Sequence, residues 1–261
     1  IKTNRVNAGT GYFPDASTNS FVSSNGGTYE FYCESNFTLP NQSTFNHLKI
    51  NSSSYTGTLI NDLTLNGNLL ITSGSLGINN ETDGIILSIT VNGDVIVDAG
   101  GSITTGSGHT FGVASANYHG NTHQFLVYGN FTNNGSVKFT NLTNPSYNAF
   151  PANDNNSGGT TLWFKGASDK ILTCNGTTNL YNLVIDKGNG QSNILEISSS
   201  DYSNFKLFGK NNETWNTSGY SESNPEIRKS LWIKNGTLKL TGKTKISSLT
   251  EGNGGSGSDY M

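Results

Sequence analysis

Charged side chains are scarce in this sequence, and their scarcity excludes several classes of protein. Asp, Glu, Lys and Arg make up only 13% of the 261 residues, and the formal net charge is -3. Disordered chains combine low hydrophobicity with a high net charge, which is absent here. Nucleic-acid binding requires a basic face, whereas the 15 Lys and Arg residues are scattered along the chain. We therefore expect a folded protein that does not bind nucleic acid.

Long hydrophobic runs and helical periodicity are also missing. The longest apolar run, Ile85–Ile89, is interrupted by a serine and falls far short of the roughly 20 residues that span a membrane. No ten-residue stretch has the i, i+3, i+4, i+7 pattern of an amphipathic helix. We expect no membrane-spanning segment. The chain begins at Ile1 without a signal peptide or initiator methionine, which favours a mature or excised piece of a longer protein.

Cysteine is rare, with only Cys33 and Cys174. An even number permits a disulfide in an oxidising compartment. Their wide separation in sequence does not tell whether they meet. A bridge and two unpaired thiols therefore both remain open.

Glycine is abundant, with 32 residues, and it accompanies many Asn, Ser and Thr residues. Runs of alternating apolar and polar residues end at Gly, Asn or Asp, as in Leu63–Leu65, Val95–Val97, Leu183–Ile185 and Leu238–Leu240. Alternation with a period of two is typical of β-strands, and Gly and Asn suit the tight turns between them. The sequence predicts an all-β protein.

Short segments of the sequence repeat. Leu69–Ile78 (LLITSGSLGI) aligns without a gap on Leu231–Leu240 (LWIKNGTLKL). Val95–Ile103 fits the same pattern with one inserted residue, and Asn130–Phe139 is a looser copy. Repeats of this kind are typical of stacked structural units, each of which cannot bury its apolar face alone.

The repeats favour one particular architecture for the whole chain. We predict a single all-β unit over 1–261, a right-handed parallel β-helix (β-solenoid) with two larger internal repeats, about 28–159 and 160–250. Residues 251–261 would form a flexible linker or the start of a next coil. At roughly 20–25 residues per coil, the chain would supply about ten coils and a rod on the order of 50 Å long. A pair of β-sandwiches is the alternative, because evenly spaced short strands also suit it.

The repeated units resemble the β-helical repeat regions of large cell-surface and secreted proteins of Bacteroidota. Those regions carry an aromatic strand, a short segment with an Asn-Leu-x-Ile core, and then a Leu- and Gly-rich run. The corresponding segments here are Thr28–Tyr32, Phe45–Ile50 and Leu63–Leu76, followed by Thr161–Phe164, Leu180–Ile185 and Leu231–Leu240.

The resemblance covers most of the chain, but its motif concerns stacking and turns rather than a reaction. It implies an extracellular or cell-surface adhesin-like protein, exported by the type 9 secretion system and in some members linked to gliding motility. The usual C-terminal sorting domain of the family is not seen here, so the resemblance also implies an internal piece of a longer chain.

Histidine and aspartate residues offer the first candidates for chemistry. His109, His119 and His123 lie close in sequence, but the segment is rich in Gly and Asn and lacks the helix on which His-x-x-x-His residues share a face. Asp94 and Asp98 lie four residues apart. On one strand their separation would be about 13 Å, too far for the paired carboxylates of a glycosidase. We predict polar loops and corner-capping aspartates instead.

Two segments suggest calcium without establishing it. Gly254–Met261 fits one copy of a Gly-Gly-x-Gly-x-Asp repeat, which binds Ca²⁺ only in tandem copies. Asn153–Asn156 offers oxygen ligands, although a solvated loop accounts for it more simply. No metal, cofactor or catalytic residue is assigned.

Aromatic residues outside the alternating strands are the remaining candidates. Such side chains stack on sugars or contact other proteins, although packing over an end of the solenoid would also explain them. The candidate binding surface comprises Tyr118, Tyr147, Phe150, Trp215 and Tyr220.

The sequence thus favours a non-enzymatic, adhesin-type segment that acts as a stiff rod. Its expected partners are glycans, surfaces, or proteins of the cell surface and the secretion machinery. A carbohydrate-active β-helix enzyme, a polysaccharide lyase or hydrolase, is the first alternative. A glycan-binding module without turnover is the second.

Overall fold

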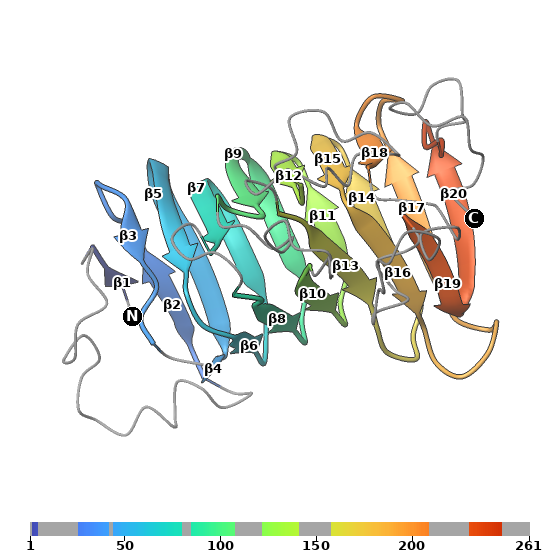
Figure 1. The fold of residues 1–261 in the computed structure, drawn as a ribbon, viewed down its shortest axis with the longest axis horizontal. Helices are drawn as coiled ribbons and strands as arrows, with labels where there is room; N and C mark the ends of the chain where they lie inside the picture. The colour runs from blue at the N-terminus through green and yellow to red at the C-terminus, as the bar shows by residue number, and fades with distance from the viewer. Residues whose placement is uncertain are drawn as a thin grey trace, which may run out of the picture.

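A computed structural model describes residues 2–4, 26–41, 44–79, 85–107, 122–140, 158–208 and 230–246. Every regular element within these ranges is a β-strand, which confirms the all-β prediction (Figure 1). None of the described residues belongs to a helix that could cross a membrane.

The strands form two sheets in which each ladder is parallel throughout the described ranges. The 13-stranded sheet, sheet A, has a main path of nine strands. In order, these are β1 (Lys2–Thr3), β2 (Thr28–Phe31), β5 (His47–Leu59), β7 (Leu69–Ile78), β9 (Val95–Thr104), β11 (Phe131–Asn133), β14 (Lys170–Cys174), β17 (Ile194–Ser199) and β20 (Thr237–Gly242). Off this path lie β3 (Phe37–Thr38), β12 (Ser136–Lys138), β15 (Thr177–Leu180) and β18 (Phe205–Leu207).

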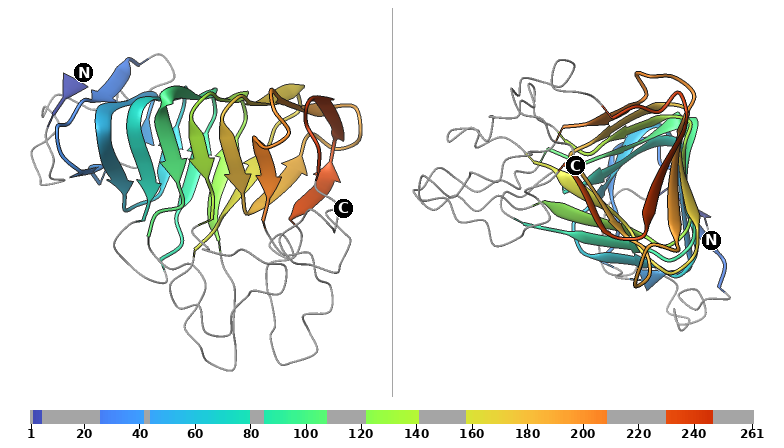
Figure 2. Two further views of the ribbon diagram at one scale, coloured as in Figure 1. Left: turned by 90° about the horizontal axis from the view of Figure 1, so that it is seen from above. Right: turned by 90° about the vertical axis from the view of Figure 1, so that its right-hand side faces the viewer.

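The 7-stranded sheet, sheet B, lies beside sheet A and takes one strand from most coils of the chain. Its strands are β4 (Thr44–Phe45), β6 (Leu63–Leu65), β8 (Ser88–Val91), β10 (His123–Val127), β13 (Thr160–Phe164), β16 (Asn182–Asp186) and β19 (Leu231–Asn235). Seen along the stack, the strands of sheets A and B lie along the sides of a triangle (Figure 2). This arrangement fits a β-solenoid. It does not fit the β-sandwich alternative, whose sheets are antiparallel.

Strand register confirms the repeat between neighbouring coils. Leu69 pairs with Val95 and Leu76 with Ile103, and the register shifts by one residue just after Ile71. That shift is the single insertion that the sequence alignment required. Phe131 of the looser copy pairs with Val95 in the same way. The alternating pattern therefore identified residues that stack directly on one another.

The sequence alignment of 69–78 on 231–240 does not match equivalent positions in the structure, because the two segments begin in different sheets. Leu231 pairs with Leu183 in sheet B, the sheet that also contains Leu63. Leu69 lies instead in sheet A. The division into two large repeats stays a prediction, although the strands that open them, β2 and β13, lie in different sheets.

Polar side chains link successive coils at one corner, where sheet B passes into sheet A. We call the four residues His47, Asn68, Asp94 and Asn130 the corner ladder. His47 Nδ1 accepts from the Asn68 N–H, and Asn68 Oδ1 accepts from the Asp94 N–H, each at 2.9 Å. Asp94 Oδ1 accepts from the Asn130 N–H at 2.7 Å, and Asn130 Oδ1 from the Ile171 N–H at 3.0 Å. Each corner side chain thus satisfies a backbone donor of the next coil.

Coil length increases along this ladder. Its four hydrogen bonds join residues 21, 26, 36 and 41 positions apart in sequence. The coils that contain the segments 108–121 and 141–157 are therefore longer than the expected 20–25 residues. The coil between β14 and β17 returns to 25 residues, since Lys170 pairs with Leu195. The nine strands of the main path give a stack about 38 Å long at ~4.8 Å per step.

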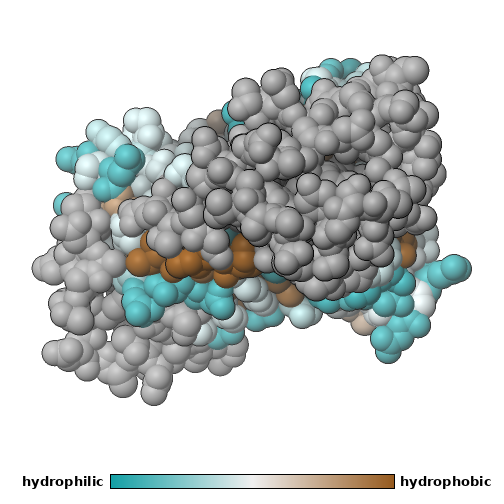
Figure 3. Space-filling view, in the orientation of Figure 1, coloured by the Kyte–Doolittle hydropathy of each residue, from teal (hydrophilic) through white to brown (hydrophobic). Residues whose placement is uncertain are grey.

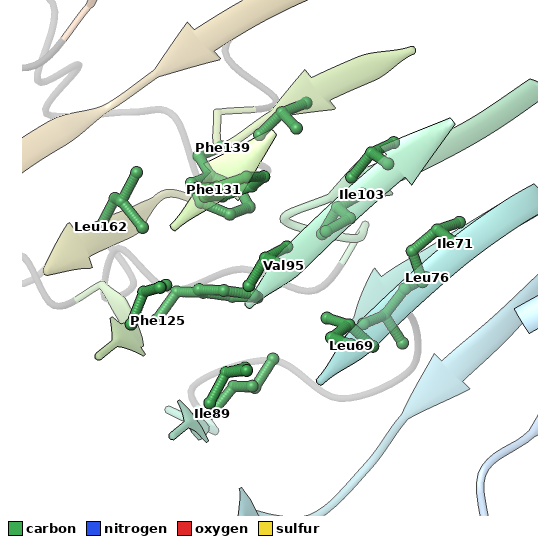
Figure 4. Packing of buried hydrophobic residues seen from close by; sticks show 14 of the residues in the cluster. Leu69, Ile71, Leu76, Ile89, Val95, Ile103, Phe125, Phe131, Phe139 and Leu162 are labelled. Carbon is green, nitrogen blue, oxygen red and sulfur yellow. The ribbon is translucent and has the colours of Figure 1, made fainter. Parts of the chain in front are cut away.

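Apolar side chains of the two sheets meet in one continuous interior (Figure 4). Residues of neighbouring coils stack in columns, since parallel pairing places equivalent side chains above one another. One column contains Leu69, Val95 and Phe131, and a second contains Ile89, Phe125 and Leu162. All six side chains are fully buried.

Two glycines of the first repeat have different roles. Gly74 has a φ of 81°, a conformation that residues with a Cβ rarely adopt. A Cβ there would also lie 2.6 Å from the Tyr55 carbonyl oxygen. Gly67 allows a close approach instead, because a Cβ at this position would collide with the His47 ring. A positive φ thus explains the glycine at position 74, and close stacking explains the glycine at position 67.

Both cysteines are buried, and no disulfide joins them. Burial raises the pKa of Cys33 and raises that of Cys174 to about 12, although a hydrogen bond with Thr178 opposes the second shift. The thiols therefore stay protonated at neutral pH and pack as small apolar groups.

Candidate functional site

Most of the residues that the sequence suggested for binding lie outside the described residues. These are Tyr118, Tyr147, Phe150, Trp215 and Tyr220, together with His109, His119, Asn153–Asn156 and Gly254–Met261. The linker prediction for 251–261 lies there too. The described candidates are His123, Asp94 and Asp98.

His123 lies inside the stack on β10 and is fully buried. Its Nδ1 accepts from the Leu87 N–H at 2.9 Å, while Nε2 has no hydrogen-bond partner. Burial lowers the pKa of His123 to about 4, so the imidazole is neutral at pH 7. Among the described residues, no three His, Cys, Asp or Glu side chains gather as a metal site.

Asp94 lies in the turn before β9, where it belongs to the corner ladder, and Asp98 lies within β9. The Asp94 carboxylate accepts a backbone N–H, which is the capping role that the sequence predicted for it. The structure therefore does not place the two aspartates on one strand.

The outer face of sheet B carries two tryptophans near the C-terminal end of the stack. Strand register places Trp163, Val184 and Trp232 in one row across β13, β16 and β19. These side chains point outward, because the flanking Leu162, Leu183 and Leu231 belong to the interior core. Val184 is nevertheless fully buried and Trp163 is only 9% exposed, whereas Trp232 is partly exposed.

Two lysines lie over these indole rings. Lys165 Nζ is 4.6 Å from the centroid of Trp163, and Lys234 Nζ lies 5.3 Å from Trp163 and 5.0 Å from Trp232. All three distances fall within the roughly 6 Å range of cation–π contacts. Lys234 therefore bridges the two indoles across the strand that carries Val184.

One carboxylate belongs to the same surface. Asp186 accepts from Lys165 Nζ at 2.6 Å and from Asn235 Nδ2 at 2.8 Å. Burial raises the pKa of Asp186, but the hydrogen bonds from Lys165 and Asn235 and the positive charges of Lys165 and Lys234 outweigh burial. The pKa of the carboxyl is therefore lowered, and it stays ionised at neutral pH.

A buried lysine supports this surface from behind. Lys187 follows β16, is fully buried, and donates from Nζ to the Lys165 carbonyl oxygen at 2.9 Å. Its pKa is lowered to about 8, mainly by burial and also by the charge of the nearby Lys170, while Asp169 opposes the shift. The contact fixes the backbone of the residue whose side chain lies over Trp163.

We call Trp163, Lys165, Asp186, Trp232 and Lys234 the Trp–Lys surface. It combines flat aromatic area, two ammonium groups and one ionised carboxylate on a rigid sheet. Such a combination suits non-covalent recognition, because aromatic faces provide stacking area and the charges provide orientation.

Sequence reasoning did not find this surface, because it treated strand tryptophans as structural. A signal was present, since Trp163-Phe164-Lys165 and Trp232-Ile233-Lys234 share the spacing Trp-x-Lys. Residues two apart on a strand lie on the same face, so each segment presents its Trp and Lys together.

Other surfaces are less distinctive. A strip of hydrophobic surface, bordered by hydrophilic residues, lies on the face seen in Figure 3. The large apolar side chains that are more than one-third exposed among the described residues are Tyr32, Tyr55, Ile85, Tyr128, Ile171, Tyr202, Ile233 and Leu240.

Comparison with known protein families, with curated proteins and with solved structures gives no match to this chain. The candidate site is therefore interpreted from its own chemistry.

Proposed function

We propose that the chain is a right-handed parallel β-helix that acts as a stiff, non-enzymatic adhesive segment of a secreted or cell-surface bacterial protein. The observation that carries the proposal is the continuous parallel pairing of nine strands along sheet A. Right-handedness follows from the general preference of parallel β-strand crossovers. The rod would hold recognition surfaces at fixed positions for glycans or partner proteins.

Stiffness follows from how the described coils are joined. Each interior strand of the main path is paired on both sides, so bending the stack would break backbone hydrogen bonds along a whole layer. The corner ladder adds side-chain links between the same layers. A segment built in this way resists bending without needing disulfides.

The state of several carboxylates supports binding over catalysis. A general acid at a glycosidase site needs a raised pKa. Glu30, Asp186, Glu196 and Asp201 instead have lowered pKa values, because hydrogen bonds and neighbouring lysines stabilise their ionised forms. These carboxylates serve as acceptors in structural contacts.

The resemblance to Bacteroidota repeat proteins supplies the cellular part of the proposal. On this proposal the chain lies outside the cell or on its surface, within a longer adhesin exported by the type 9 secretion system. The glycan-binding module is the second candidate function, and the Trp–Lys surface favours it because aromatic platforms suit sugar rings.

One experiment separates binding from turnover. The purified chain is run through native gels that contain neutral or acidic polysaccharides, and the same mixtures are assayed for new reducing ends and unsaturated sugars. We expect retarded migration with at least one polysaccharide and no product. Product release would establish an enzyme, and migration unaffected by every polysaccharide would contradict the adhesive role.

A further inference from the structure

The Trp–Lys surface contains the same pair of side chains twice. Trp163 lies on β13 and Lys165 directly follows that strand, whereas Trp232 and Lys234 lie on β19, two ladder steps away. At ~4.8 Å per step, the backbones at Trp163 and Trp232 are about 9.6 Å apart. Lys234 lies at a register shift, because Ile185 pairs with Ile233 and Asp186 with Asn235. The surface thus repeats the same pair of residues along the long axis of the stack, but Trp163 is only 9% exposed, whereas Trp232 is partly exposed.

The two lysines differ in how their charges are balanced. Lys165 forms an ion pair with Asp186, and its side chain is only 25% exposed. Lys234 is exposed, and among the described residues its close contacts are the two indole rings, while its charge also acts on Asp186. The Lys234 ammonium is therefore available to an anionic group that approaches from solvent.

We propose that the Trp–Lys surface binds an acidic saccharide through a uronic acid residue. The sugar carboxylate pairs with Lys234, and the apolar face of the pyranose ring stacks on the exposed part of Trp232. Asp186 has acceptor capacity beyond its two hydrogen bonds and accepts from a sugar hydroxyl. This inference rests on the proposed adhesive function and names a ligand class for it.

The geometry favours a saccharide over an acidic peptide. A run of peptide carboxylates would approach the ionised Asp186 as well as the lysines, and like charges repel. A sugar chain presents hydroxyl donors between its carboxylates and suits the alternation of charge on this surface.

The test uses isothermal titration calorimetry with the full chain. The probes are oligosaccharides of galacturonate, of alginate and of hyaluronan, the methyl ester of the oligogalacturonate, and hexaglutamate as an acidic peptide. The methyl ester keeps the sugar ring and removes its charge. The variants are Lys234→Gln, Lys234→Arg and Trp232→Ala, and Lys206→Gln is the control because Lys206 is an exposed lysine on β18 of sheet A.

We expect at least one acidic oligosaccharide to bind, with affinity that falls as salt rises. Lys234→Gln should weaken binding about tenfold or more, because a charge-assisted hydrogen bond is lost, and Lys234→Arg should restore most of it. For oligogalacturonate, the methyl ester should bind about tenfold more weakly. Lys206→Gln should leave the affinity unchanged.

Several results would overturn the inference. These are no binding of any acidic oligosaccharide, equal binding of the oligogalacturonate ester, equal binding of hexaglutamate, or full affinity in Lys234→Gln. Binding of neutral polysaccharides alone would reject this ligand class while leaving the adhesive function intact. Product release would reject the adhesive function itself, so the two failures are distinguishable.

Discussion

Among single residues, His123 is a buried group whose ionisation would affect stability in mildly acidic solution. Its ring is enclosed by the stack, one nitrogen accepts from the Leu87 N–H, and the other has no partner. Adding a proton would place a charge where neither water nor an acceptor compensates it. This is why burial lowers the pKa of His123 to about 4.

The pH dependence of stability should show this shift. In the unfolded chain His123 titrates near its ordinary value of 6.5, whereas the folded chain binds the proton only near pH 4. The unfolded state therefore gains protons first as pH falls, and stability is lost between about pH 6.5 and 4. Full loss corresponds to about 3 kcal/mol.

Urea unfolding of the native chain and of His123→Gln at pH 4, 5, 6 and 7 measures this contribution. Glutamine removes the titration and keeps an acceptor for the Leu87 N–H. Between pH 7 and pH 4, we expect the native chain to lose about 3 kcal/mol more of its unfolding free energy than His123→Gln loses. Parallel curves for the two proteins would show that His123 does not carry the effect.

Among structural elements, the corner ladder explains why polar residues recur where strands end. A turn leaves backbone N–H groups without partners in its own coil, and a side-chain oxygen of the preceding coil accepts them. Asp62 and Asp169 act in the same way toward the N–H groups of Ser88 and Ile194. The Asn and Asp residues of this composition therefore link coils as well as shape turns.

Removing one hydrogen bond of the corner ladder should lower the free energy of unfolding measurably. Asp94→Ala would leave the Asn130 N–H without its acceptor, and we expect a loss of about 1–3 kcal/mol in the free energy of unfolding. Asp94→Asn keeps an oxygen at the same place and should lose much less. Urea unfolding followed by circular dichroism measures both variants, and equal stability of the two would argue against the ladder.

Strand prediction succeeded where the signal was local. Period-two alternation and corner glycines place Leu69 on Val95 with the right single-residue insertion. The same pattern does not say which sheet a strand joins, so Leu231 was aligned with Leu69 although it pairs with Leu183 in sheet B. Similar strands on different sides of a coil have similar sequences, because both alternate inward and outward residues.

The Trp–Lys surface was beyond sequence reasoning for a related reason. Trp163 and Trp232 are far apart in the chain, and only two successive ladders, β13 to β16 and β16 to β19, bring them into one row. The coils between them differ in length, so no fixed period predicts that row. The Trp-x-Lys spacing is visible in the sequence, but its meaning depends on the register.

For the whole molecule, the parallel stacking of coils is the central feature. Stiffness, the corner ladder and the alignment of the two Trp-x-Lys segments all follow from the register of neighbouring strands. That register is defined well away from the candidate site, where Thr64 of β6 pairs with Thr90 of β8. Both side chains are partly exposed on sheet B.

Disulfide trapping of this pair tests the stacking most directly. In a parallel ladder, paired residues on neighbouring strands lie about 4.8 Å apart, which a disulfide can bridge. Ser88, two residues from Thr90, would be about 8 Å from Thr64, too far for a bridge. Double variants Thr64→Cys/Thr90→Cys and Thr64→Cys/Ser88→Cys are oxidised and analysed by non-reducing peptide mapping. We predict a bond in the first variant and none in the second, whereas no bond in the first or a bond only in the second would contradict the stacked parallel coils.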